Sequence, residues 1–355
     1  MDFPSQACVR RRGSPWRMKQ AMRFAGIVMV LLVCMLAALP ARAAGKNYVL
    51  ATASPGGTYY PVGTAIATLV KADLSLEHDI GMVAIPTAGS VENLSLLERG
   101  EADFAIMQGL VGHDAWSGKR TFANDAPHRG FRAVTALWHN VEQFVLRTEH
   151  VRTGTIADLL ALKGSAVGLG DRESGTLLSN RVLLENLGID IDRHFSLAYL
   201  GYGPATDALQ AGNIVAIGIP AGLPTKSLSR MKSAMGSAVT ILGFNPEQAK
   251  LADNGLGLWS SYVIAAQTYP GQPESITTIA QPNLLVVNAG VSDDVVYRIV
   301  KVIFERRAFL QAMHPATAEL ELKNALVGLP IPLHPGAQRY FEEAGLTVPA
   351  RLHVP

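Results

Sequence analysis

Three turns of this 355-residue chain place glycines and hydroxyl side chains in front of helical repeats. In the first, "SPGGTYYP", Gly57, Thr58 and Tyr59 precede apolar residues spaced i, i+3, i+4, i+7 and i+8. This spacing predicts a helix beginning near Pro61, after a short strand. A strand, a glycine turn and a helix N-terminus in series present backbone N–H groups and the positive end of a helix dipole. The turn therefore suits an anion, although an ordinary βα connection has the same pattern.

The second turn lies in "VAIPTAGSVENLSLLERGEADFAIMQ" and has the same order of strand, turn, helix and strand. Ser90 is predicted to be the N-cap of the helix, with Glu92 in its first turn. Asn93 would lie on the same helix, and Gln108 follows the next strand. We expect Ser90, Asn93 and Gln108 to face a ligand in addition to any structural role.

The third turn, in "AVGLGDRESGTLLSNRVLLENLG", puts Ser174, Gly175 and Thr176 at a helix entrance. Its glycines partly match a dinucleotide-binding fingerprint. However, Glu173 occupies the place of the third glycine, where an acidic side chain would repel a pyrophosphate. The three turns together give nine candidate ligand-binding residues: Gly57, Thr58, Tyr59, Ser90, Asn93, Gln108, Ser174, Gly175 and Thr176.

Motifs for catalysis and metal binding are absent from the sequence. A P-loop fails in "GHDAWSGKR", because five residues separate Gly112 from Gly118 and Arg120 stands where a magnesium-binding hydroxyl is required. The chain has no HExxH, no GxSxG and no pair of histidines at helical metal-binding spacing. We therefore expect a protein that is not an enzyme and that uses no cofactor and no metal ion.

Short apolar runs alternate with helical repeats along most of the chain and predict an α/β fold. Two long extended segments, 132–147 and 262–288, could each cross between two lobes. We predict lobe 1 from 44–142 and 272–355, with lobe 2 inserted as 143–271. Each lobe is expected to have a mainly parallel sheet flanked by helices, with the ligand cleft between lobes at the carboxyl ends of strands. The strand-like runs are 49–51, 81–85, 104–107, 134–137, 144–146, 166–169, 197–200, 215–219, 239–242 and 284–287.

Residues 1–43 have the pattern of a Sec-type signal peptide, with basic residues, an apolar run from Phe24 to Leu39 and Ala41-Arg42-Ala43 at the cleavage site. Cleavage is expected after Ala43, with export to the periplasm. The rest would carry 24 basic and 28 acidic residues, a net charge of −4. This balance argues against a nucleic-acid partner.

Several blocks in a fixed order resemble the TAXI-type extracytoplasmic solute receptors of TRAP transporters. They are "GGTYYPVG", "GSVENLSLLERGEADFAIMQ", "LKGSAVGLGDRESGT", "DALQAGNIVA" and the segment from "TIAQPNLLVV" to "IPLHPGAQRYFEEAG". The resemblance implies a two-lobed, type II periplasmic-binding-protein-like fold. It also implies a receptor that passes a small anionic organic solute to TRAP permease membrane subunits. That solute would be an amino acid such as glutamate, or an organic or keto acid.

The resemblance implies that the three turns line the pocket, and it leaves other points open. Arg172 and Glu173 depart from the smaller residues usual before the "SGT" element, and they either bias selectivity or face solvent. Arg147 is the basic residue best placed to bind a carboxylate in place of the turns. The signature His334 to Tyr340 is structural or docks the permease. A periplasmic ligand sensor acting on a membrane signalling partner is the alternative function.

Overall fold

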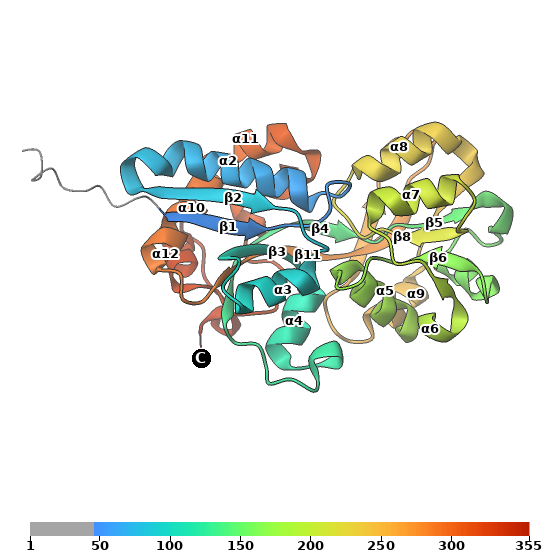
Figure 1. Ribbon diagram of the computed structural model, residues 1–355, viewed down its shortest axis with the longest axis horizontal. Coiled ribbons are helices and arrows are strands. Elements are labelled where there is room, and N and C mark those ends of the chain that lie inside the picture. Colours follow the sequence, from blue (N-terminus) through green and yellow to red (C-terminus); the bar gives the residue numbers. More distant parts are fainter. Residues whose placement is uncertain (1–45, 355) are drawn as a thin grey trace, which may run out of the picture. The chain divides into compact units, whose positions relative to one another are not determined.

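Two β-sheets organise the part of the chain that the computed structural model describes, residues 46–354 (Figure 1). The predicted signal peptide and its cleavage site lie outside these residues. Within 46–354, none of the helices combines the length and apolar character needed to cross a bilayer. The first sheet has the order β10 (Ser260–Ile264), β11 (Ile276–Asn288), β3 (Phe104–Gln108), β1 (Lys46–Ala51) and β2 (Ile80–Ile85), with β4 (Phe131–Val141) also paired to β11.

The second sheet takes all its strands from residues 144–242, between β4 and β10 of the first sheet. Each apolar run predicted as a strand overlaps a strand of one of the two sheets. The order in the second sheet is β7 (Ser196–Leu197), β6 (Ala166–Gly168), β8 (Ala216–Gly218), β5 (Phe144–Arg147) and β9 (Val239–Leu242).

Both sheets are mixed, so the α/β class is confirmed but the expectation of mainly parallel sheets is wrong. Strand β1 runs parallel to β2 and β3, whereas β11 runs antiparallel to β3, β4 and β10. In the second sheet β6 runs parallel to β7 and β8, and β5 runs antiparallel to β8 and β9. Each antiparallel pair contains β5 or β11, which lie in the long extended segments 132–147 and 262–288. No helix separates β5 from β4 or β11 from β10, whereas a parallel neighbour requires a crossover connection.

Two residues, Glu142 and Gln143, connect β4 of the first sheet directly to β5 of the second. Their backbone is held on the first-sheet side by a bond from Glu142 N to Ile279 O at 2.9 Å. The chain returns to the first sheet between β9 and β10. Residue 271, the predicted second boundary of the inserted lobe, lies in the loop between β10 and β11, which pair with each other. The domain limits themselves stay a prediction.

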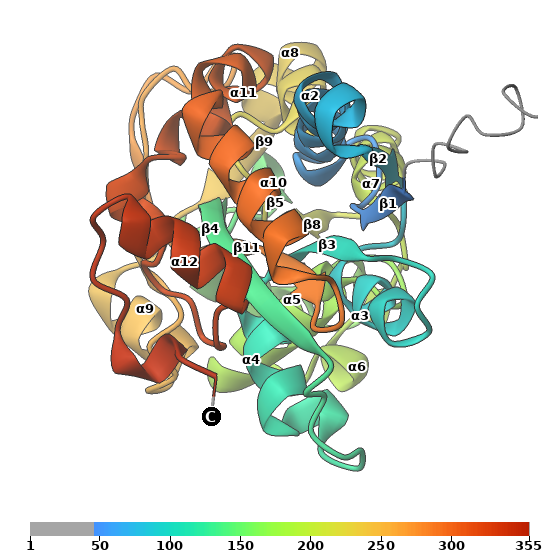
Figure 2. The same ribbon diagram turned by 90° about the vertical axis from the view of Figure 1, so that its left-hand side faces the viewer.

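Helices cover both faces of each sheet (Figures 1 and 2). Helices α2 (Tyr59–His78) and α10 (Asp293–Glu305) lie on one face of the first sheet, and α3 (Ser90–Glu98) and α4 (Gly109–Ser117) on the other. Figure 2 shows α10 beside α12 (Pro335–Glu343), and α11 (Arg307–Met313) lies near α2. One face of the second sheet is covered by α5 (Gly175–Asn186), α6 (Ile191–His194) and α9 (Pro246–Asp253). The other face is covered by α7 (Tyr202–Gln210) and α8 (Lys226–Met235).

Candidate ligand-binding site

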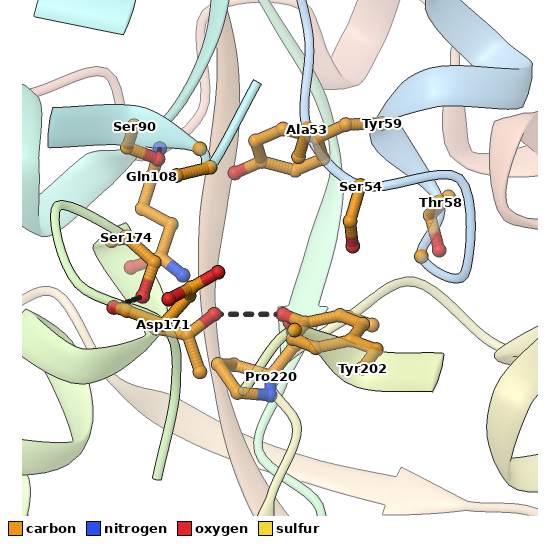
Figure 3. A pocket seen from close by; sticks show the side chains of 17 residues that line it. Ala53, Ser54, Thr58, Tyr59, Ser90, Gln108, Asp171, Ser174, Tyr202 and Pro220 are labelled. Carbon is orange, nitrogen blue, oxygen red and sulfur yellow. Dashed lines mark hydrogen bonds between the residues drawn. The ribbon is translucent and has the colours of Figure 1, made fainter. Parts of the chain in front are cut away.

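One cavity lies between elements of the two sheets and encloses about 490 Å³ of space, including its open mouth (Figure 3). Five helices begin at its wall: α2, α3 and α4 from the first sheet, and α5 and α7 from the second. The first backbone N–H groups of a helix have no partner within the helix, and the dipole makes this end positive. All five N-cap residues line the cavity: Thr58, Gly89, Gln108, Ser174 and Gly201.

The turn between β1 and α2 contributes Gly57, Thr58 and Tyr59 to the lining. Helix α2 begins at Tyr59, two residues before the predicted start. Thr58 Oγ1 donates to Gly222 O at 3.1 Å, which connects this turn to the loop between β8 and α8. The buried Tyr59 hydroxyl donates to Asn283 Oδ1 at 2.5 Å. Burial raises the pKa of Tyr59 well above its usual value, so the hydroxyl keeps its proton.

Ser90 lines the cavity but is not the N-cap of α3, which corrects the sequence-based prediction. The N-cap is Gly89, whose φ of 128° and ψ of −152° suit glycine alone. Ser90 is instead the first helical residue, and its Oγ accepts the backbone N–H of Gln108 at 3.1 Å. This bond joins the start of α3 to the end of β3. It leaves the Ser90 hydroxyl a proton that it can donate.

Asn93 does not line the cavity. Its fully buried side chain donates to Thr52 O at 2.7 Å and to Ile106 O at 2.8 Å, and its Oδ1 accepts from Thr87 Oγ1 at 2.7 Å. These three bonds use the amide to connect β1, β3 and the turn before α3. Asn93 therefore positions the wall of the cavity and has no group directed into it.

The turn between β6 and α5 contributes Ser174, Gly175 and Thr176. Ser174 caps α5 as predicted, because its Oγ accepts from Leu177 N at 3.0 Å and donates to Asp171 O at 2.6 Å. Both bonds occupy the hydroxyl within the turn. Thr176 Oγ1 lies 2.9 Å from Tyr202 Oη. Since the Tyr202 hydroxyl donates to Pro220 O, the Thr176 hydroxyl is the donor in this pair.

None of the described residues that line the cavity is Lys, Arg or His, and Asp171 is the only charged one. Arg147 and Arg172 are both outside the lining. Arg147 donates to Glu149 Oε1 at 3.1 Å and to Leu209 O at 3.3 Å. The exposed Arg172 guanidinium lies 3.9 Å from the centroid of the Tyr199 ring. Positive potential in the cavity therefore comes from backbone dipoles.

A family model described as NMT1-like matches residues 50–345. The chain belongs to the NMT1-like family. Among solved structures it is similar to PhnD1 from Prochlorococcus marinus in complex with methylphosphonate, with a TM-score of 0.50 and 13% identity, covering 77% of this chain and 91% of that one. It is also similar to the periplasmic binding protein BugD, with a TM-score of 0.48 and 14% identity over 84% of this chain and 94% of BugD. The fold is that of periplasmic solute-binding proteins.

The structure of this NMT1-like chain brings eight of the nine predicted ligand residues to one cavity, and only Asn93 lies outside it. Sequence analysis missed the fourth contributing turn, Gly201-Tyr202 before α7, although "YLGYGPATDALQ" has the same order of strand, glycine turn and helix. It also missed Asp171, which precedes the predicted "SGT" element by three residues. The other lining residues that it missed are Ala53, Ser54, Ala88, Gly89, Pro220 and Ala221.

Two further expectations concern groups away from the cavity. Within residues 46–354, no cluster of three His, Cys, Asp or Glu side chains is arranged to hold a metal ion.

His334 is buried at the N-cap of α12, where Nδ1 accepts from Gly336 N at 3.2 Å and Nε2 donates to Val291 O at 2.9 Å. These bonds give the "HPG" part of the signature a structural role at the start of α12.

Proposed function

We propose that this chain is an extracytoplasmic receptor that binds a small carboxylate-containing solute and delivers it to the membrane subunits of a TRAP-type permease. The observation that carries the proposal is the convergence of five helix N-termini on one cavity whose lining contains no basic side chain. Backbone N–H groups and hydroxyls then replace a guanidinium as the partners of a carboxylate. The permease type follows from the TAXI-like sequence blocks, and export to the periplasm follows from the signal-peptide pattern of residues 1–43.

The expected energetics suit a receptor that must also release its solute. A micromolar dissociation constant corresponds to about 8 kcal/mol. Hydrogen bonds to a charged group contribute roughly 1.5–3 kcal/mol each, and a helix N-terminus adds up to ~1 kcal/mol. Three or four such bonds supply this affinity after the entropic cost of association. Binding without chemistry is supported by the Ser174 hydroxyl, which donates its proton to Asp171 O and accepts from Leu177 N within its own turn.

Replacing Thr176 with alanine tests whether the turns bind the carboxylate. The natural solute is first identified by mass spectrometry of small molecules released from the denatured, purified protein. When the solute binds, the Thr176 hydroxyl is expected to donate to the charged carboxylate in place of the neutral Tyr202 Oη, so calorimetry with that solute should show binding weakened about tenfold for Thr176→Ala. Thr176 is a cleaner target than Ser174, whose loss would also remove the cap of α5.

Arg147→Gln is the matched control, because Arg147 lies outside the lining and bonds to Glu149 and Leu209. It should bind the solute within about threefold of the unaltered protein. Near-complete loss of binding for Arg147→Gln, with little change for Thr176→Ala, would contradict the proposal and make the turns purely structural. Thermal unfolding of both variants separates lost affinity from lost folding.

A further inference from the structure

The cavity contains one carboxylate, and its position is fixed by the turn that carries it. Asp171 follows β6 by three residues and precedes the N-cap Ser174. Its Oδ1 accepts the backbone N–H of Arg172 at 2.8 Å, and its backbone oxygen accepts the Ser174 hydroxyl at 2.6 Å. None of the ion pairs within 4 Å that residues 46–354 form involves Asp171.

Gln108 contributes a second acceptor that lacks a partner. Its side chain is 3% exposed, lines the same cavity and extends into the interior from the end of β3 (Figure 3). Its Oε1 is buried and accepts no hydrogen bond from the described residues. A buried carbonyl oxygen without a donor is unfavourable, so this atom calls for a donor supplied by a ligand.

The two acceptors conflict with a ligand that carries only negative charge. Asp171 would repel a second carboxylate in the closed cavity, where the local dielectric constant is low. The helix N-termini attract the carboxylate of the solute, and Asp171, which lines the same cavity, competes with it for these positive ends. A group that is positively charged and rich in donors resolves both problems, because an ammonium donates three hydrogen bonds and neutralises one carboxylate.

We infer that the solute is a zwitterion, a small amino acid whose ammonium group binds Asp171 and Gln108 while its carboxylate lies at the helix N-termini. This inference rests on the proposed carboxylate-binding function and selects among its substrate classes. Keto acids and dicarboxylic acids of the same size lack the ammonium and leave Asp171 uncompensated. Asp171 is thus the residue that determines the specificity of the receptor.

Matched pairs of solutes that differ only at the amino group test the inference by calorimetry. The probes are L-glutamate with 2-oxoglutarate, L-leucine with 4-methyl-2-oxopentanoate, and L-alanine with pyruvate. In at least one pair, the amino acid should bind the unaltered protein ten times more tightly than the keto acid or better. Asp171→Asn should lower the affinity for that amino acid at least tenfold and leave the affinity for the keto acid equal or higher.

Glu173→Gln is the matched control, because it also removes one negative charge, two residues from Asp171. Glu173 is exposed and does not line the cavity, so this variant measures the effect of charge outside the site. It should keep the preference of the unaltered protein. Equal affinity for both members of a pair, or a preference that persists in Asp171→Asn, would overturn the inference and leave the proposed carboxylate receptor standing. If none of the six probes bound, the inference would fail, and the proposed function would be tested separately, by whether the solute identified by mass spectrometry carries a carboxylate.

Discussion

Replacing Gly175 with alanine should weaken solute binding at least a hundredfold while leaving the fold intact. A Cβ at this position would lie 2.7 Å from Ser90 Oγ, 2.8 Å from Ser90 Cβ and 3.1 Å from Gln108 Cδ. Ser90 and Gln108 belong to the first sheet and its helices, whereas Gly175 begins α5 of the second. The added methyl group would therefore hold the two walls of the cavity apart, and the solute would lose contacts on one side.

The backbone of Gly175 is helical, so alanine fits its conformation and should preserve α5. Calorimetry measures the affinity, and small-angle scattering at saturating solute should give a larger radius of gyration for Gly175→Ala than for the unaltered protein. Gly203→Ala is the matched control, because it lies in the first turn of α7 and its added Cβ would meet nothing within 4 Å. Unchanged affinity and compaction in Gly175→Ala would contradict a cavity that closes between these walls.

The contacts across the cavity explain why closure and binding should be coupled. Glu92 N donates to Glu173 O at 3.0 Å, joining the start of α3 to the turn before α5. Thr58 Oγ1 donates to Gly222 O at 3.1 Å on the opposite side. Both bonds connect first-sheet and second-sheet elements beside the lining, so rotation about the short link at Glu142 and Gln143 would break them. A bound solute adds further bonds to each wall and favours the closed arrangement.

Local sequence patterns predicted the three turns and most of the strands, because those features depend on a few neighbouring residues. The prediction that Ser174 caps α5 is confirmed, since a serine directly before a helical repeat is strongly preferred as the N-cap. The predicted N-cap of α3, Ser90, was wrong by one residue. The N-cap is Gly89, whose backbone conformation is unfavourable for residues with a side chain. Ser90 is therefore free to accept the backbone N–H of Gln108, eighteen residues away.

Features that depend on distant residues could not be predicted from spacing. The polarity of Asn93 suggested a ligand contact, but its partners Thr52 and Ile106 come from two other segments of the first sheet. The antiparallel direction of β11 depends on the pairing of residues more than a hundred positions apart. Asp171 and Glu173 are two acidic residues of one turn, and the sequence gives no reason to choose between them. Only the structure shows that Asp171 lines the cavity and that Glu173 is exposed outside it.

The link between the sheets contains a buried acid whose titration should make stability depend on pH. Glu142 is fully buried, and burial raises its pKa to about 7, against a value of 4.5 in the unfolded chain. Trp259 Nε1 donates to Glu142 Oε1 at 3.0 Å and only partly opposes this shift. Between pH 4.5 and pH 7 the folded state holds more protons than the unfolded state. Its stability therefore falls as pH rises through this window, by roughly 3 kcal/mol, and then levels off.

Glu142→Gln should remove this loss, because an amide retains the acceptor for Trp259 and has no charge to bury. At pH 8 the variant should be more stable than the unaltered protein by up to about 3 kcal/mol, with little difference at pH 4.5. Urea unfolding at both pH values measures the two differences. Glu77→Gln, at an exposed position in the last turn of α2, is the matched control and should follow the unaltered protein at both pH values. If Glu142→Gln lost stability between pH 4.5 and pH 8 as steeply as the unaltered protein, another group would have to be the titrating one, and Glu142 would be ionised or solvated within the link.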